Sequence, residues 1–159
     1  MEIPIIIRQA TLSDLEEMLA IEEANPTSEE AFSRQSLEES IRKTAGTFLV
    51  AGDENQLVGY VLGALVSETH THTNGCLEIK RVVIHPDHRR QGLGTLLLAS
   101  LKQAAVEEGV KCLRLTCSDD LLSYFEMNGF IEEEVPEALY ASSSEWNLIW
   151  VSPFYQEEI

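Results

Sequence analysis

The stretch VVIHPDHRRQGLGTLLL, residues 82–98, decides the fold of this 159-residue chain. An apolar, β-rich run, Cys76–Ile84, leads into it, and apolar residues recur at helical spacing beyond it. We therefore expect a strand over Cys76–Ile84, a tight turn that contains Gly92 and Gly94, and a helix over Thr95–Glu108. This order of elements is typical of a mixed α/β domain.

The turn between this strand and this helix is a candidate anion site. The first N–H groups of a helix lack partners within the helix, and the helix dipole is positive at that end. Gly92 and Gly94 leave the backbone accessible, and Arg89 and Arg90 add positive charge at the same place. A tight connection alone would not require the two arginines, so the pattern favours a phosphate-binding turn.

Two other phosphate-binding motifs do not fit this segment. The dinucleotide fingerprint requires a third glycine where Leu97 stands, and it opens the first βαβ unit rather than a late one. A P-loop requires Gly-Lys-Ser/Thr after the turn, which the sequence does not provide.

Composition and length bound the class of protein. With 44% hydrophobic and 24% charged residues, 159 residues can form one folded domain over 1–159. No apolar run approaches the roughly 18 residues of a membrane span, and the first residues lack the basic region of a signal peptide. We therefore expect a cytoplasmic protein that does not bind membranes.

The formal net charge of −16 is unevenly distributed along the chain. Residues 1–79 carry 14 acidic and 4 basic side chains, and residues 115–159 carry 10 acidic and no basic ones. Residues 80–114 carry 7 basic and 3 acidic side chains. The acidic total argues against a nucleic-acid partner, whereas the basic island is expected to meet an anionic ligand.

The remaining segments predict alternating strands and helices. Periodicity and turn residues indicate further strands at 3–8, 47–51, 57–66, 110–116, 130–135 and 146–151. Helices are expected after a capping box at Thr11–Asp14, after a cap at Thr27 or Ser28, and over 118–128. In the strand Cys76–Ile84, simple alternation puts Glu78 and Lys80 on one face and Leu77, Ile79, Arg81 and Val83 on the other.

Two segments resemble the GNAT N-acetyltransferase superfamily. Residues 82–98 resemble its motif A, whose signature is Arg/Gln-x-x-Gly-x-Gly/Ala, and YFEMNGF at Tyr124–Phe130 is similar to motif B. Within the superfamily, Cys117–Phe125 resembles the serotonin (arylalkylamine) N-acetyltransferase group. The resemblance implies the GNAT fold, an α/β domain with a central, mostly antiparallel twisted sheet, a splayed pair of parallel strands, and flanking helices.

The same resemblance implies acetyl-CoA as co-substrate and no metal. The pyrophosphate is expected on the backbone of the turn, and the pantetheine arm on the main chain of the strand before it, as an added strand would bind. The Val82 N–H is a candidate donor to the reaction's oxyanion. The expected cofactor-binding residues are Val82, Val83, Ile84, Arg89, Arg90, Gln91, Gly92, Leu93, Gly94 and Thr95.

The catalytic residues of the resembled group are replaced here. Its two histidines correspond to Glu78 and Lys80, and its tyrosine to Phe125. Glu78 is the predicted base that deprotonates the amine, with a plain ion pair to Lys80 as the alternative. Tyr124 is the predicted acid for the leaving thiolate, with a half-buried aromatic side chain as the alternative.

Other reactive side chains are given structural roles. Cys76, Cys112 and Cys117 form no CxxC pattern, and we interpret them as buried or free thiols. The pair His70 and His72 is interpreted as part of a solvated loop rather than a metal site. By the resemblance, residues 26–32 and 136–146 are the segments expected to cover the acceptor.

Together these features predict an N-acetyltransferase that moves acetyl from acetyl-CoA to a small primary amine, an arylalkylamine or a polyamine, by direct attack through a tetrahedral intermediate. One alternative is an enzyme that acetylates protein N-termini or lysines. The other is an acyl-CoA-binding module with impaired catalysis. The expected partners are acetyl-CoA and the amine, with a homodimer as the possible assembly.

Overall fold

A seven-stranded sheet forms the centre of the computed structural model, which describes residues 4–25, 33–44, 46–65, 75–133 and 145–155. The strand order is β1-β2-β3-β4-β5-β7-β6. Neighbouring strands are antiparallel except β4 and β5, which are parallel, so the predicted mixed α/β sheet with one parallel pair is confirmed. The strands are β1 (Ile6–Gln9), β2 (Phe48–Gly52), β3 (Leu57–Leu65), β4 (Cys76–Ile84), β5 (Cys112–Ser118), β6 (Ile131–Glu132) and β7 (Glu145–Val151).

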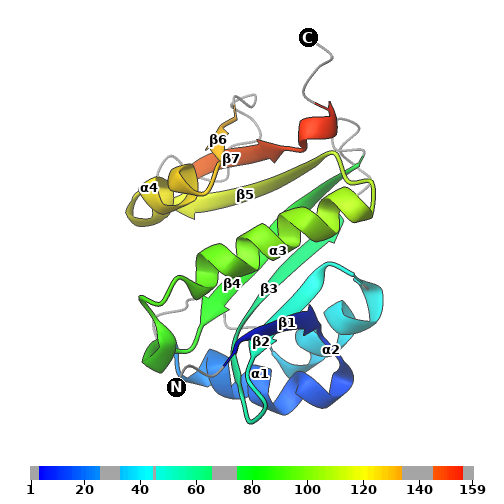
Figure 1. Ribbon diagram of the computed structural model, residues 1–159, viewed down its shortest axis with the longest axis vertical. Helices are drawn as coiled ribbons and strands as arrows, with labels where there is room; N and C mark the ends of the chain where they lie inside the picture. The colour runs from blue at the N-terminus through cyan, green and yellow to red at the C-terminus, as the bar shows by residue number, and fades with distance from the viewer. Residues whose placement is uncertain (1–3, 26–32, 45, 66–74, 134–144, 156–159) are drawn as a thin grey trace.

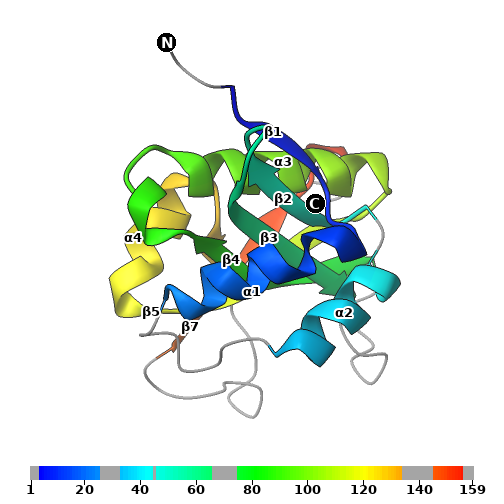
Figure 2. The ribbon, with the colours of Figure 1, turned by 90° about the horizontal axis from the view of Figure 1, so that it is seen from below.

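Helices cover both faces of this sheet. The helix α3 (Leu93–Glu107) lies along one face, and α1 (Leu15–Glu23) and α2 (Arg34–Lys43) lie on the opposite face (Figure 2). The fourth helix, α4 (Asp119–Met127), packs on the α3 side through Phe125. Each face buries its own apolar cluster, and this burial is the main driving force for the fold. Among the described residues, no helix has the length and apolarity needed to cross a membrane.

The parallel strands β4 and β5 stay paired for three positions. Cys76, Leu77 and Glu78 lie opposite Cys112, Leu113 and Arg114, and the strands then separate although both continue. Figure 1 shows the two strands diverging, with α3 crossing beside them. The sheet therefore opens beyond Glu78, and this is the splayed pair that the resemblance to the GNAT superfamily implied.

A bulge in β4 corrects the predicted faces of that strand. Leu62 of β3 pairs with Arg81 while Gly63 pairs with Ile79, so Lys80 is an extra residue. Because an inserted residue reverses the alternation, Arg81 lies on the α1 side with Glu78, and Val83 joins the α1 and α2 core. The expectation that Arg81 and Val83 share a face with Ile79 was therefore wrong.

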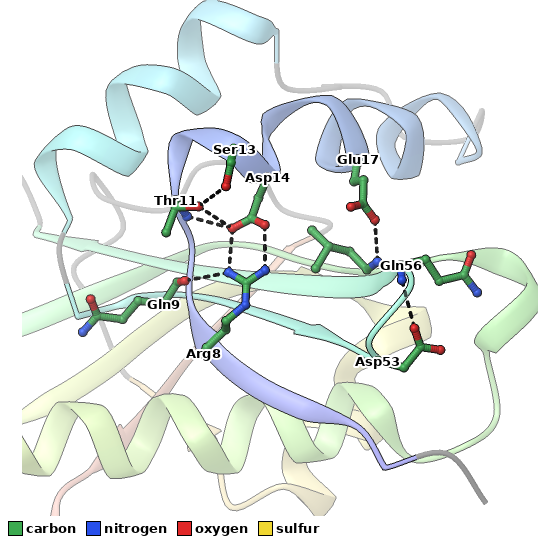
Figure 3. Close-up of polar contacts among 9 residues, drawn as sticks. Arg8, Gln9, Thr11, Ser13, Asp14, Glu17, Asp53 and Gln56 are labelled. Carbon is green, nitrogen blue, oxygen red and sulfur yellow. Dashed lines mark hydrogen bonds and ion pairs between the residues drawn. The ribbon is translucent and has the colours of Figure 1, made fainter.

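The helix α1 is fixed at its start to the strands beneath it. The Arg8 guanidinium donates to both carboxylate oxygens of Asp14, at 2.8 and 2.7 Å, and Glu17 accepts from the Leu57 backbone N–H at 2.6 Å (Figure 3). Asp14 also accepts from the Thr11 backbone N–H at 2.8 Å, which confirms the predicted capping box. The Arg8 hydrogen bonds hold the pKa of Asp14 below its usual range.

Element boundaries differ modestly from the predicted ones. The helix α3 begins at Leu93, two residues before the predicted Thr95, because Gly92 takes the N-cap position. Ser33 caps α2 by accepting from the Ser36 N–H at 3.1 Å, whereas the predicted caps at 27 and 28 lie outside the described residues. These shifts leave every predicted element in its place along the chain.

Cys76 and Cys112 form a disulfide, so the interpretation of these two residues as thiols was wrong. They are direct partners at the closed end of the splayed pair, with Cα atoms 4.6 Å apart. The bond encloses the chain between them, which carries most of β4, the turn that contains Gly92, and all of α3. No signal in the sequence indicated this disulfide. The two cysteines are 36 residues apart, and they meet only because of the register between β4 and β5.

We predict that the double substitution Cys76→Ala with Cys112→Ala lowers the free energy of unfolding by up to about 4 kcal/mol, because a loop of this length constrains the unfolded chain. Urea unfolding of wild type with and without dithiothreitol measures the same effect. The double variant serves as the control and should not respond to dithiothreitol. An unfolding midpoint of wild type that ignores the reductant would contradict the disulfide.

Candidate active site

A cavity of about 460 Å³ is bounded by β4, the turn after it, the start of α3, and α4. Every predicted cofactor-binding residue lines it except Gln91, which is exposed to solvent and is not part of the lining. The lining residues are Asn25, Arg81, Val82, Val83, Ile84, His88, Arg89, Arg90, Gly92, Leu93, Gly94, Thr95, Leu121, Tyr124 and Phe125. Of these, Asn25 and Arg81 were not singled out from the sequence as site residues.

The turn at one end of the cavity has the geometry of an anion site. Gly92 has φ 76°, a left-handed conformation that glycine adopts without strain, and a Cβ there would meet no atom within 4 Å. The first backbone bond of α3 runs from the Leu96 N–H to the Gly92 carbonyl at 3.0 Å. The N–H groups of Leu93, Gly94 and Thr95 come before Leu96 in the chain and have no carbonyl partner within the helix. They are therefore available to an anion.

The main chain of β4 forms the wall beside this turn. Val82, Val83 and Ile84 pair with β3 on one side and lie beyond the last position paired with β5. Among the described strands, none pairs with their other edge. Such an edge can accept an extended ligand through backbone hydrogen bonds.

Glu78 lies at the point where β4 and β5 separate. It is the last β4 residue paired with β5, and its side chain is 40% exposed on the face opposite α3. The Lys80 ammonium lies 3.0 Å from its carboxylate. Glu78 is not part of the cavity lining. It lies where β4 and β5 separate, but it is not among the predicted cofactor-binding residues that line the cavity.

Tyr124 and Phe125 are neighbours on α4, but they face different surroundings at the cavity. Tyr124 lines the cavity, and its hydroxyl lies so close to Gly94 that any side chain at position 94 would collide with it. Phe125, at the position of the resembled tyrosine, is 7% exposed and packs edge-on against Tyr124 and Phe130, with ring centroids 5.2 and 5.9 Å apart. The phenol hydroxyl at this cavity therefore comes from Tyr124 and not from position 125.

Asn25, two residues beyond the end of α1, lines another side of the cavity, and Glu22 near the end of α1 binds the lining residue Arg81. Glu22, 4% exposed, accepts from Arg81 Nε at 3.0 Å and Nη2 at 2.5 Å, and from the Tyr60 hydroxyl. Burial, reinforced by Glu22, raises the pKa of Tyr60. Because Arg81 lies one residue past the bulge at Lys80, only the bulge directs it toward α1.

The remaining candidate nucleophiles and ligands have structural surroundings. Burial raises the pKa of Cys117, which keeps it a thiol and disfavours covalent chemistry. The His85 ring accepts from the Asp87 backbone N–H at 3.1 Å and caps a short 3-10 turn, η3 (Pro86–His88). Within the described part of the chain, no group of three or more His, Cys, Asp or Glu could hold a metal ion. His70, His72 and the predicted acceptor segment 26–32 lie outside the described residues, as does all of the predicted segment 136–146 except Glu145 and Trp146.

Residues 12–130, well over half of the chain, match the model of the acetyltransferase (GNAT) family. The chain therefore belongs to that family. A curated relative, glucosamine 6-phosphate N-acetyltransferase from Schizosaccharomyces pombe, is 32% identical over 69 residues, which are 43% of this chain and 62% of the relative.

Solved structures share the fold at low sequence identity. PaiA N-acetyltransferase from Thermoplasma acidophilum in complex with coenzyme A has a TM-score of 0.73 and 17% identity, over 93% of this chain and 99% of that one. N-acetylglutamate synthase from Neisseria gonorrhoeae, complexed with coenzyme A and N-acetyl-glutamate, has a TM-score of 0.75 and 22% identity, over 96% of this chain and 36% of that one. These similarities agree with the seven-stranded sheet and its parallel pair.

We predict that Gly92→Val weakens coenzyme A binding about tenfold or more. A branched side chain is strained at φ 76° and occupies the space in front of the turn. Isothermal titration calorimetry with coenzyme A measures the loss. Gly109→Val is the matched control, because Gly109 follows the other end of α3 with φ 75° and equally open surroundings. Equal affinities in the two variants would refute the phosphate-binding role of the turn.

Proposed function

We propose that this protein transfers the acetyl group of acetyl-CoA to a primary amine by direct attack, through a tetrahedral intermediate. The observation that carries the proposal is the separation of β4 from β5 just beyond Glu78, which leaves a strand edge leading to an anion-binding turn. Membership of the acetyltransferase (GNAT) family and the coenzyme A complexes of similar folds support it.

The charge and the exposed backbone of the cavity residues support their proposed role in binding acetyl-CoA. The N–H groups of Leu93, Gly94 and Thr95, together with Arg89 and Arg90, would hold the pyrophosphate. The backbone of Val82, Val83 and Ile84 would hold the pantetheine arm along the open edge of β4. When bound, acetyl-CoA supplies an activated thioester carbonyl, and the Val82 N–H is the proposed donor to its oxyanion. Gln91 remains a proposed contact from outside the cavity.

Proton transfers from the nitrogen and to the sulfur complete the reaction. An ammonium must lose a proton before its nitrogen can attack the thioester carbon, and Glu78 is the proposed base, directly or through water. Nitrogen then bonds to the carbonyl carbon and forms the tetrahedral intermediate, in which the nitrogen still carries one proton too many. As the intermediate collapses, the nitrogen releases this second proton to water, the carbon–sulfur bond breaks, and the thiolate takes a proton. Tyr124 is the proposed donor of that proton, because its hydroxyl lies in the cavity beside Gly94.

The proposed acceptor is a small amine, an arylalkylamine or a polyamine. The chain outside the basic island is strongly acidic, which favours a cationic acceptor. Coenzyme A release from acetyl-CoA, measured against a no-amine control with arylalkylamines, polyamines and N-terminal peptides, tests this choice. Release with a small amine supports the proposal, release with peptides alone refutes the acceptor class, and binding of acetyl-CoA without release from any acceptor refutes the enzyme.

We predict that Glu78→Gln lowers kcat about 100-fold at neutral pH and removes the rising limb of the kcat–pH profile, because the amide cannot accept the proton. The steady-state profile from pH 5 to 9 measures both effects. Lys80→Gln is the matched control, since it breaks the same ion pair and leaves the carboxylate in place. An equal loss of kcat in the two variants would show that Glu78 acts as the ion-pair partner of Lys80 and not as the base.

We predict that Tyr124→Phe lowers kcat tenfold or more while the KM for acetyl-CoA changes less than threefold, because only the hydroxyl is lost and the ring keeps its packing. Initial rates with acetyl-CoA measure both constants. Phe125→Tyr in the same variant tests whether a hydroxyl one residue later restores the rate. Unchanged kcat in Tyr124→Phe would assign protonation of the thiolate to solvent.

A further inference from the structure

The end of α1 and Asn25, two residues beyond it, contact two different walls of the cavity. Glu22 binds Arg81 of β4, and Asn25, three residues later, accepts from the Arg89 guanidinium of the phosphate-binding turn. The start of α1 is already fixed through Arg8 and Asp14 (Figure 3). The helix thus connects the outer strand β1 with the cavity.

Asn25 is held in one orientation by its own contacts. The residue is 6% exposed, its side-chain N–H donates to the Ile21 carbonyl at 2.6 Å, and its backbone N–H donates to the Glu22 carbonyl at 3.1 Å. The amide nitrogen is therefore occupied by α1, and the amide oxygen is left to accept from Arg89. Asn25 also lines the cavity, so this contact lies at the cofactor site.

Arg89 retains the capacity to bind a second group. A guanidinium carries five N–H donors in a rigid fork, and the contact with Asn25 uses Nη2. Within the described ranges, no other acceptor contacts the Arg89 guanidinium, which lines the cavity beside the turn. A bound phosphate oxygen and the Asn25 carbonyl oxygen can therefore share it.

We propose that Asn25 is a positioning residue that holds Arg89 for the cofactor phosphates and transmits their binding to the end of α1. The inference rests on the proposed function, since it requires coenzyme A in the cavity. Once Arg89 is held by both groups, Asn25 and the C-terminal end of α1 that precedes it become more rigid. Because coupling between two sites is reciprocal, an ordered α1 end must in turn favour cofactor binding.

Amide hydrogen exchange with coenzyme A as the probe tests the proposal without an acceptor. We expect coenzyme A to slow exchange at residues 20–25 at least threefold in wild type, alongside slowing at the turn, residues 89–96. In Asn25→Ala the slowing at 20–25 should disappear while that at 89–96 persists, and the dissociation constant of coenzyme A should rise three- to tenfold. Asn25→Asp keeps an oxygen for Arg89 and should restore both readouts.

Asp14→Asn is the matched control, because it loosens α1 at the end remote from the cavity. It should speed exchange along α1 and leave the coenzyme A effect at 20–25 intact. Slowing at 89–96 without slowing at 20–25 in wild type would overturn the role of Asn25 and leave the proposed function standing. No binding of coenzyme A to wild type would overturn both, and the wild-type result decides even where Asn25→Ala does not fold.

Discussion

The candidate site exists because the backbone pairing between β4 and β5 stops after three positions. Three paired positions, closed by the disulfide at Cys76 and Cys112, hold the strands together at one end. Beyond Glu78 the backbone groups of β4 that would have bonded β5 become available to a ligand. Buried backbone donors and acceptors need partners, so this opening is the physical basis of the site, and α3 and the turn complete it.

The bulge at Lys80 determines which side chains surround that opening. It turns Arg81 toward Glu22 on α1, where a buried carboxylate receives donors from both Arg81 and Tyr60. Without the extra residue, Arg81 would face the apolar core under α3, where an unpaired charge is costly. One inserted residue therefore both anchors α1 and leaves Val82 and Ile84 against the α3 core.

Local signals in the sequence were sufficient for the turn and most elements. Gly92 and Gly94, with Arg89 and Arg90 before them, predicted an anion site at this turn. All four residues line the cavity, and the binding of an anion there stays a prediction. The register between strands, and the contacts between residues that are distant in the sequence, could not be predicted from such local signals. The bulge at Lys80, the Cys76–Cys112 bond and the contact of Asn25 with Arg89 join residues whose separation in the sequence carries no periodic signal. The likeness to the serotonin N-acetyltransferase group remains a likeness of residues 117–125.

A crystal structure of the complex with coenzyme A tests the central claim most directly. The account predicts the pyrophosphate on the backbone N–H groups at the start of α3 and the pantetheine arm along β4 from Val82 to Ile84, with the thiol between the separating strands. Coenzyme A bound elsewhere, or β4 and β5 paired throughout their length in the complex, would contradict it.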